Sequence, residues 1–415
     1  MKINLSTILS IIVLMINIIL SHLFYSEGNE FILSTVLVVI DIIFIGIIFS
    51  KKTENKNLYL IIFLSLIVRT LLMYFELYGR NIFVLPNSGR DTEAFFTLPF
   101  ESGNESLSGY FLFIKFLGHL FCKQRIMFQF VNVIFSILTD VIMLKIFDKL
   151  KFNNKAKIIG ILLISFLPSN MIISAELLRE ELMVLLNVCS LYFFIEWFIN
   201  GKNKNFIYSV LLLILSAYFH SSMVIAIFGY FYAYVFYDRK NNKMVYSVKA
   251  IGRLLLAIVI FIVLYLLFYS YINSYFYNIG DIDYLNDKLS YYAEGNSVYL
   301  ASLAHTSSLF ELILTSPLKF IYFYASPVPW EWRSVVDICI FFLSSIFYIF
   351  PYTKLFKKKS PIVKILFIMV TIIGFTYGLS CFSTGSAMRH REKAMPFVGL
   401  LIPLLINEKG DKNEI

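Results

Sequence analysis

The stretch "FILSTVLVVIDIIFIGIIFS", Phe31 to Ser50, is followed at once by "KKTENK", Lys51 to Lys56, and then by a second apolar run. A run of about 20 apolar residues is the length that crosses a bilayer as an α-helix. A short basic loop between two such runs is typical of a helical hairpin in a membrane. Similar runs recur along the 415 residues, so the sequence predicts an all-α polytopic membrane protein.

The overall composition excludes a soluble globular protein. The chain is 59% hydrophobic and only 15% charged, whereas a soluble protein covers its core with a largely polar shell. The net charge of +9 would suggest a nucleic-acid partner in a soluble protein. In a membrane protein it reflects lysines and arginines that gather in cytoplasmic loops, so we expect a lipid bilayer and no nucleic acid as partner.

Hydropathy divides the chain into candidate spans within a single integral membrane domain, residues 1–415. Most of the candidates are apolar runs close to the length of a bilayer-crossing helix. The twelve predicted spans are 3–24, 31–50, 57–77, 126–148, 158–175, 180–199, 205–219, 221–237, 250–272, 334–352, 361–382 and 394–407. We interpret the first run as a retained helix because it contains no small-residue cleavage site.

The charged connections orient these spans. If the twelve spans alternate across the membrane, five short basic connections fall on one side. These connections begin at Lys51, Lys149, Gly201, Asp238 and Lys354. Because short cytoplasmic loops carry an excess of lysine and arginine, we expect this side, both termini and the tail 408–415 to be cytoplasmic.

Two larger segments, 78–125 and 273–333, then lie on the outer face. The first contains the apolar piece Tyr110 to Phe121, which is short for a span and contains Lys115 and His119. Counting this piece as a span would also invert the basic connections. We therefore predict an interfacial or re-entrant helix there.

Polar stretches gather on the same predicted outer side. They are "PNSGRDTEAFF" (Pro86–Phe96), "SAELLREE" (Ser174–Glu181), "FHSS" (Phe219–Ser222), "SPVPWEWR" (Ser326–Arg333) and "STGSAMRHREK" (Ser383–Lys393). Arginine is frequent on this side, although the preference for positive loops inside disfavours it there. Because arginine binds phosphate through a planar, bidentate fork, these stretches predict a site for an anionic lipid headgroup or a diphosphate.

Such a site has the groups needed to transfer a sugar from a lipid-linked diphosphate. Cations stabilise the departing diphosphate, and a carboxylate or histidine accepts the proton of the attacking hydroxyl. The candidates for that base are Asp91, Glu93, His220 and His390. The candidates for substrate binding are Arg90, Glu176, Arg179, Glu180, Trp330, Trp332, Arg333, Arg389 and Arg391. The sequence has no CxxC or HExxH spacing, and we expect neither a metal nor another cofactor.

Each stretch also has a purely structural interpretation. Glu176, Arg179 and Glu180 share one face if they lie on a helix. Ser174 would then cap an ion-paired helix start. The other structural alternatives are a turn at Gly89, a hydrogen-bonded His220, an interfacial aromatic belt at Trp330 and Trp332, and a basic lipid anchor at Arg389–Lys393.

The five stretches, with the continuation "AMRHREKAMPFVGLLIPLL" (Ala387–Leu405), resemble those of bacterial Wzy-type oligosaccharide repeat-unit polymerases, including EpsG-like members. The resemblance runs from about Phe83 to Leu405 as a pattern of short motifs. It implies a GT-C-like helical membrane fold. It also implies transfer of a growing undecaprenyl-diphosphate-linked glycan onto a new lipid-linked repeat unit, which builds O-antigen, capsule or exopolysaccharide.

The resemblance further implies metal-independent, inverting catalysis on the periplasmic or outer face of a bacterial inner membrane. A separate chain-length regulator protein is a possible partner in such a system. Arg179, Arg389 and Arg391 would hold the diphosphates, while Glu176 and Glu180 would orient Arg179. The sequence has no unambiguous counterpart of the basic loop motifs of some members, so the identity of the base stays open.

Two other classes of protein remain open. A flippase for lipid-linked oligosaccharides could also have twelve spans and a cationic cavity. Transporters commonly contain internal repeats and broken helices, whereas the polar stretches here gather at one face. A membrane glycosyltransferase that uses a polyprenyl-phosphate sugar usually has acidic residues and a metal in its first outer loop, where this sequence has only Glu27 and Glu30. Nothing specific supports a non-catalytic scaffold.

Overall fold

The computed structural model describes residues 5–26, 28–101, 109–267, 283, 286–287, 306–354, 360–381 and 383–407. Outside these residues lie parts of the predicted outer segments 78–125 and 273–333, the end of the predicted span 250–272, most of the connection that begins at Lys354, and the predicted tail 408–415. The chain divides into unit 1, Met1–Tyr192 with Leu215–Ser221, and unit 2, Phe193–Ile214 with Ser222–Ile415.

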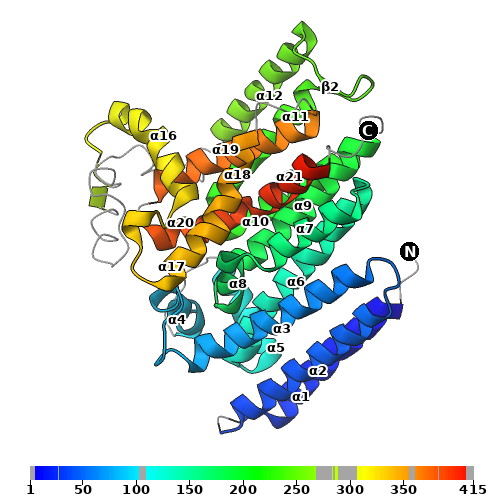
Figure 1. Ribbon diagram of the computed structural model, residues 1–415, viewed down its shortest axis with the longest axis vertical. Helices are drawn as coiled ribbons and strands as arrows, with labels where there is room; N and C mark the ends of the chain where they lie inside the picture. The colour runs from blue at the N-terminus through cyan, green and yellow to red at the C-terminus, as the bar shows by residue number, and fades with distance from the viewer. Residues whose placement is uncertain are drawn as a thin grey trace. The chain divides into compact units, whose positions relative to one another are not determined.

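Unit 1 is helical. Its elements are α1 (Leu5–Phe24), α2 (Glu30–Ser50), α3 (Lys56–Tyr78), α4 (Arg90–Thr97), η1 (Leu98–Phe100), α5 (Gly109–Phe121), α6 (Arg125–Lys149), α7 (Asn154–Ser165) and α8 (Pro168–Ala175). Helix α9 (Glu180–Asn200) begins in this unit, and α10 (Asn203–Phe219) ends in it. Figure 1 shows α1 and α2 as two long helices that lie side by side and contact each other.

Unit 2 is also mainly helical. Its further elements are η2 (Ser221–Ile225), α11 (Ala226–Phe236), β1 (Tyr237–Asp238), β2 (Lys243–Met244), α12 (Val248–Leu267), α16 (Leu309–Ala325), η3 (Pro329–Glu331), α17 (Val335–Ile340), the π-helical turn η4 (Phe341–Ser345), α18 (Ile346–Lys354), α19 (Pro361–Ser380), α20 (Thr384–Arg391), η6 (Glu392–Ala394) and α21 (Met395–Asn407). Strands β1 and β2 pair antiparallel, with Tyr237 opposite Met244, around the basic connection predicted at Asp238.

Among the described residues, seven helices are long and apolar enough to cross a membrane. They correspond to the predicted spans 3–24, 31–50, 57–77, 126–148, 180–199, 334–352 and 361–382. The length of an apolar run predicts these helices well because each must bury about 20 residues in the hydrocarbon layer. The prediction of an all-α, multi-pass membrane protein is confirmed at this level.

The other five predicted spans are not among these seven helices. The span 158–175 is a pair of helices, α7 and α8, with a bend of 47° between them. The spans 205–219, 221–237 and 394–407 correspond to helices that are too short to count as full spans by themselves. The span 250–272 is described only to the end of α12. The described residues thus contain seven helices that are long and apolar enough to cross a membrane, or up to eight with the bent pair, and the count of twelve spans stays a prediction.

Both predicted outer segments contain helices. Segment 78–125 includes α4, η1 and α5, and α5 coincides with the short helix predicted near 110–121. The described end of segment 273–333 forms α16, which has 17 residues with Pro317 inside it. Helix α16 was not predicted from the sequence, because Glu311, Pro317 and Lys319 interrupt its apolar pattern.

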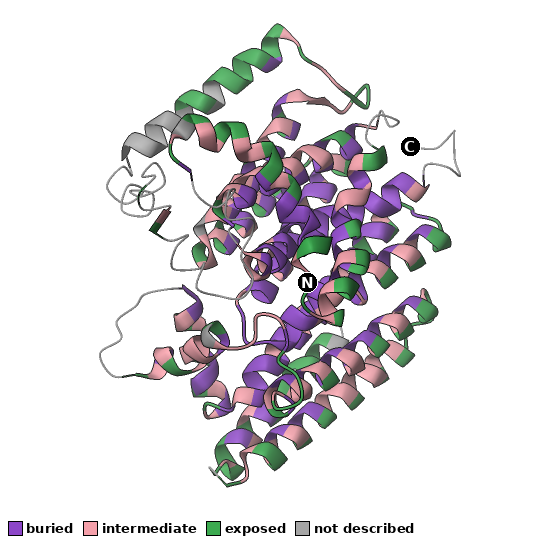
Figure 2. Cartoon of the chain, turned by 60° about the vertical axis from the view of Figure 1, so that its left-hand side comes forward, coloured by how far each residue is buried: buried purple, intermediate pink, exposed green. Residues whose placement is uncertain are grey.

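Two helices organise the packing of the two units. In unit 1, α3 packs against α2, α6, α7 and α8, and in unit 2, α19 packs against α11, α16 and α21. A Cβ atom on Gly378 of α19 would lie 3.1 Å from the main-chain oxygen of Lys319, so glycine allows α16 and α19 to approach closely. Buried residues gather where helices face one another, while exposed residues lie on outward faces (Figure 2).

Candidate functional site

A fully buried arginine holds the bend between α7 and α8 in unit 1. Arg69 lies inside α3 and has no exposed surface. Its guanidinium donates to the main-chain oxygens of Ser165 (3.0 Å) and Asn170 (3.1 Å). It also donates to the side-chain oxygens of Asn170 and Ser174, both at 2.7 Å. Because the last carbonyls of a helix have no partner within that helix, Arg69 supplies donors where α7 ends.

Two amide side chains of α6 hold the main chain between α8 and α9. Gln129 donates to the carbonyl of Ala175 at 2.8 Å. Asn132 donates to the carbonyls of Glu176 at 2.9 Å and Leu178 at 2.8 Å. These three bonds fix the turn 175–178, which leaves α8 in an extended conformation at Glu176.

This turn corrects one interpretation of the stretch Ser174–Glu181. A continuous helical face through Glu176, Arg179 and Glu180 is wrong, because α8 ends at Ala175 and α9 begins at Glu180. Ser174 is not an N-cap either, since it lies within α8 and donates to the carbonyl of Met171. The acidic first turn of α9 agrees with the favourable position of carboxylates at a helix N-terminus.

Arg179 brings three of the predicted stretches together in unit 1. Its side chain is 26% exposed, and its Nη1 atom donates to the carbonyl of Phe219 at 3.3 Å. Its guanidinium carbon lies 6.0 Å from the ring centre of Phe95 in α4. Its Nε atom lies 4.0 Å from a carboxylate oxygen of Glu180, whose side chain is fully buried. The stretches 86–96, 174–181 and 219–222, distant in sequence, therefore meet at this guanidinium.

Next to this group, Glu93 bridges two arginines. Its two carboxylate oxygens accept hydrogen bonds from Arg80 and Arg125, each at 2.6 Å. The hydrogen bond from Arg125, together with that from Arg80, holds the pKa of Glu93 below its ordinary value, although burial opposes the shift. A general base is most effective when its pKa lies near the working pH. Glu93 is therefore a weak candidate for the general base. Asp91, in the same helix, is exposed.

We expect the stabilising effect of Glu93 to be present at neutral pH and lost in acid. A folded-state pKa below the ordinary value of 4.5 means that the unfolded chain takes up the proton first as the pH falls. The effect is therefore complete above that value and disappears as the pH falls through the pKa of the folded state. Thermal unfolding of the wild type and of Glu93→Gln, from about pH 7 to about pH 3, measures it.

The difference in apparent melting temperature between these two proteins should shrink as the solution becomes acidic. Glu101→Gln is the control, because Glu101 is exposed and should show a small difference at every pH. A constant gap between wild type and Glu93→Gln across the range would contradict the bridging role.

In unit 2, the predicted stretches 326–333 and 383–393 also meet. The Ser326 hydroxyl donates to Glu331 at 2.9 Å and lies 3.3 Å from the Thr384 hydroxyl. Arg391, fully buried, donates to the carbonyl of Ser326 and to the hydroxyl of Ser345 at 3.0 Å. Ser345 closes the π-helical turn η4, a type of turn that is frequent at functional sites. Arg391 thus fixes the fold of both stretches, and its part in binding diphosphate stays a prediction.

The neighbouring candidates of α20 are less buried. Arg389 and His390 are half-buried in its last turn, where cations interact favourably with the helix dipole. The ring of His390 stacks on Tyr377 with 5.2 Å between ring centres. His390 therefore stays a candidate base that has a fixed ring orientation.

The aromatic candidates differ in exposure. Trp330 is 67% exposed, and its indole N–H donates to the Tyr322 hydroxyl at 3.0 Å. Trp332 is half-buried and donates to the carbonyl of Pro327 at 3.0 Å. Arg333 is exposed. The exposed ring of Trp330 suits contact with a sugar or with a lipid interface, and the structure favours neither interpretation.

Three residues of these groups, Arg69, Asn132 and Glu331, were not predicted from the sequence. Arg69 and Asn132 lie inside predicted spans, where a polar side chain is costly and is often functional or paired. An arginine within the run 57–77 was the available signal for Arg69. Burial raises the pKa of the Glu331 carboxyl, although hydrogen bonds from Ser326 and others oppose the shift.

Arg90 begins α4, but its side chain lies outside the described part of the structure.

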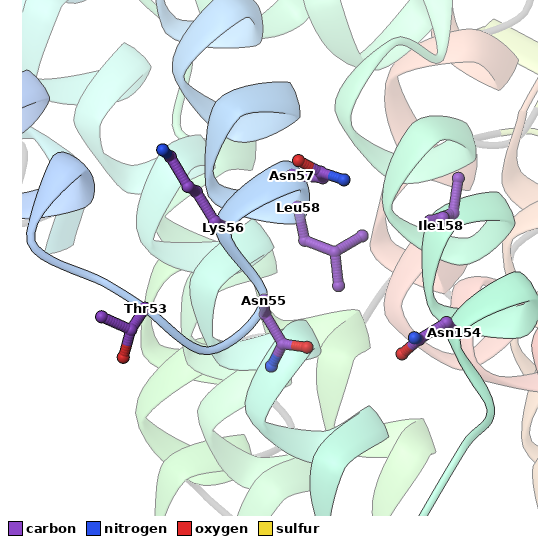
Figure 3. Close-up of a pocket in the computed structure, with 7 residues that line it drawn as sticks. All are labelled: Thr53, Asn55, Lys56, Asn57, Leu58, Asn154 and Ile158. Carbon is purple, nitrogen blue, oxygen red and sulfur yellow. The ribbon is translucent and has the colours of Figure 1, made fainter.

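A pocket of about 320 Å³ lies between the start of α3 and the start of α7, near Asn55 and Asn154 (Figure 3). Asn55 donates to Asp148 at 3.2 Å, so the basic connections that begin at Lys51 and Lys149 meet there. The candidate site residues do not line this pocket.

Each unit thus has its own candidate group: Arg179 with Phe95 and Phe219 in unit 1, and His390 and Arg391 with the turn at Ser326 in unit 2. The described residues contain no group of three or more histidine, cysteine or acidic side chains placed to hold a metal ion. Comparison of the chain with protein-family models, with curated proteins and with solved structures gives no match in any of the three.

Proposed function

We propose that this protein is an oligosaccharide repeat-unit polymerase of a bacterial inner membrane. It transfers a glycan from undecaprenyl diphosphate to a second lipid-linked repeat unit on the extracytoplasmic face, and so builds a surface polysaccharide. The observation that carries the proposal is the half-buried Arg179 guanidinium, which lies between Phe95 and the Phe219 carbonyl on a turn anchored by α6. A chain-length regulator protein is a further proposed partner.

The proposed chemistry uses the candidate residues as follows. A hydroxyl oxygen of the acceptor sugar forms a bond to the anomeric carbon of the donor glycan. The bond from that carbon to the diphosphate oxygen breaks, and its electron pair leaves with the diphosphate. Arg179 stabilises the growing negative charge, since fixed cations are most effective where charge develops.

The hydroxyl proton moves to a base, for which Asp91, His220 and His390 are the candidates. Asp91 is exposed at the start of α4, and His220 directly follows the Phe219 carbonyl that Arg179 contacts. Glu93 already accepts hydrogen bonds from two arginines, which lowers its basicity. In unit 2, Arg333, Arg389 and Arg391 are proposed to bind a lipid diphosphate.

Deletion of the gene in its host tests this function. We expect lipid-linked glycans to stall at a single repeat unit on the outer face of the membrane, as sized by mass spectrometry of extracted lipids. Expression of the wild type should restore long glycans, whereas Arg179→Ala should not. Long glycans in the deletion strain, or a repeat unit that lacks one sugar, would contradict a polymerase.

A flippase for the same lipid-linked unit is the second candidate, and the bend of 47° between α7 and α8 favours it. Broken helices are common in transporters. The same deletion separates the two functions, because a missing flippase leaves complete repeat units on the cytoplasmic face. Protection of the accumulated glycan from an added outer-face glycosidase would indicate a flippase.

A further inference from the structure

We infer that Gln129 and Asn132 are positioning residues, which hold the turn 175–178 so that Arg179 presents its guanidinium to the diphosphate. Both amides lie in α6, one turn apart, and both are buried. The two amides can position Arg179 for catalysis only if Arg179 acts in the transfer, so this inference rests on the function proposed above.

Each of the two amides uses both of its N–H donors. The Nδ2 atom of Asn132 donates to the carbonyls of Glu176 (2.9 Å) and Leu178 (2.8 Å). The Nε2 atom of Gln129 donates to the carbonyl of Ala175 (2.8 Å) and to the Glu76 carboxylate (2.7 Å). A side-chain amide has only two such donors, so the main chain of the turn takes three of the four.

These bonds replace a helical ladder that has ended. Helix α8 stops at Ala175, and the carbonyls at a helix end need donors from elsewhere. Buried carbonyls without donors would cost free energy, because water does not reach them to replace the missing donors. Asn132 and Gln129 therefore determine where the chain leaves α8 and at which angle it reaches Arg179.

The position of Arg179 follows directly from this turn. Arg179 is the residue after Leu178, and its own carbonyl accepts from Met183 within the start of α9 at 3.3 Å. The guanidinium is thus carried on a short segment that is fixed at both ends. A binding group on such a rigid support loses less freedom when it meets its ligand, which favours accurate placement.

The test is a double-mutant cycle on purified protein. Asn132→Leu keeps the branching of the side chain at Cγ and removes both donors. It should lower kcat/KM for transfer by roughly 10- to 100-fold, because small misplacements have effects of this size. In an Arg179→Lys background the same change should cost less than about twofold, because the compact lysine ammonium does not need the orientation of a planar fork.

A purely structural role gives a different result. Rates are normalised to folded protein by size-exclusion chromatography, and Ser136→Ala of α6, whose hydroxyl donates to the carbonyl of Val133 in the same helix, is the matched control. If Asn132→Leu does not fold, Gln129→Met serves in its place. Equal losses in both backgrounds, or no loss in either, would overturn the positioning role alone. Full activity of Arg179→Ala would overturn the proposed function as well.

Discussion

Replacement of Arg179 by lysine is expected to lower polymer formation by roughly 10- to 150-fold per folded molecule. Charge-assisted hydrogen bonds contribute about 1.5–3 kcal/mol each, which corresponds to that range. Lysine keeps the positive charge but cannot form the planar, two-point contact of arginine with a phosphate. Arginine can contact a ligand through its planar fork while another N–H group donates to the Phe219 carbonyl, and lysine has no such fork.

The measurement is the rate at which lipid-linked repeat units are converted into longer glycans by purified protein. Arg239→Lys is the matched control, because Arg239 also donates to a main-chain carbonyl, that of Trp197 at 3.5 Å, and lies in a predicted cytoplasmic connection. The control should retain the wild-type rate within about twofold. A wild-type rate for Arg179→Lys would show that a single positive charge is enough, and it would contradict a bidentate contact between Arg179 and the phosphate.

Replacement of Arg69 by leucine is expected to destabilise the protein by about 3–5 kcal/mol, the cost of removing one partner from a buried charged network. Leucine removes the Arg69 donor from the carbonyl and the side-chain oxygen of Asn170. The carbonyl of Ser165 then keeps only the Ser65 hydroxyl, at 3.2 Å. Asp140 is affected too, because the Ser165 hydroxyl that donates to it at 2.8 Å belongs to the same network. The bend between α7 and α8 should then lose its fixed angle.

The loss of stability is measured by thermal unfolding in detergent, with the fraction of protein that stays monodisperse as the readout. Arg69→Lys should recover only part of it, because a single ammonium cannot reach both helices. Lys155→Ala is the control, since Lys155 is exposed and should change stability by less than about 0.5 kcal/mol. A wild-type melting temperature for Arg69→Leu would mean that the bend is held by packing alone.

Most spans were predictable because their signal is local. A run such as Phe31–Ser50 needs only its own apolar length to be recognised. The same reasoning does not decide 394–407, because α21 has 13 residues and is almost wholly buried. An apolar run of that length is as compatible with a core helix as with a span, and sequence alone does not separate the two.

The candidate site was predictable only in part, for a similar reason. The stretches 86–96, 174–181 and 219–222 were predicted on one face, and the structure brings them into contact around Arg179. The break at residues 176–179 could not be predicted, because its hydrogen bonds come from Asn132, more than 40 residues earlier in the chain. Local helix propensity favours a continuous helix there, and side chains of α6 override it.

The most direct test of the proposed polymerase is reconstitution. Lipid-linked single repeat units, extracted from the deletion strain, are mixed with purified protein in liposomes that contain no other enzyme, with and without EDTA. We predict glycans of two and more repeat units on undecaprenyl diphosphate, with release of free undecaprenyl diphosphate, in both conditions and for the wild type but not for Arg179→Ala. Repeat units that stay single, or elongation that EDTA abolishes, would contradict a metal-independent polymerase.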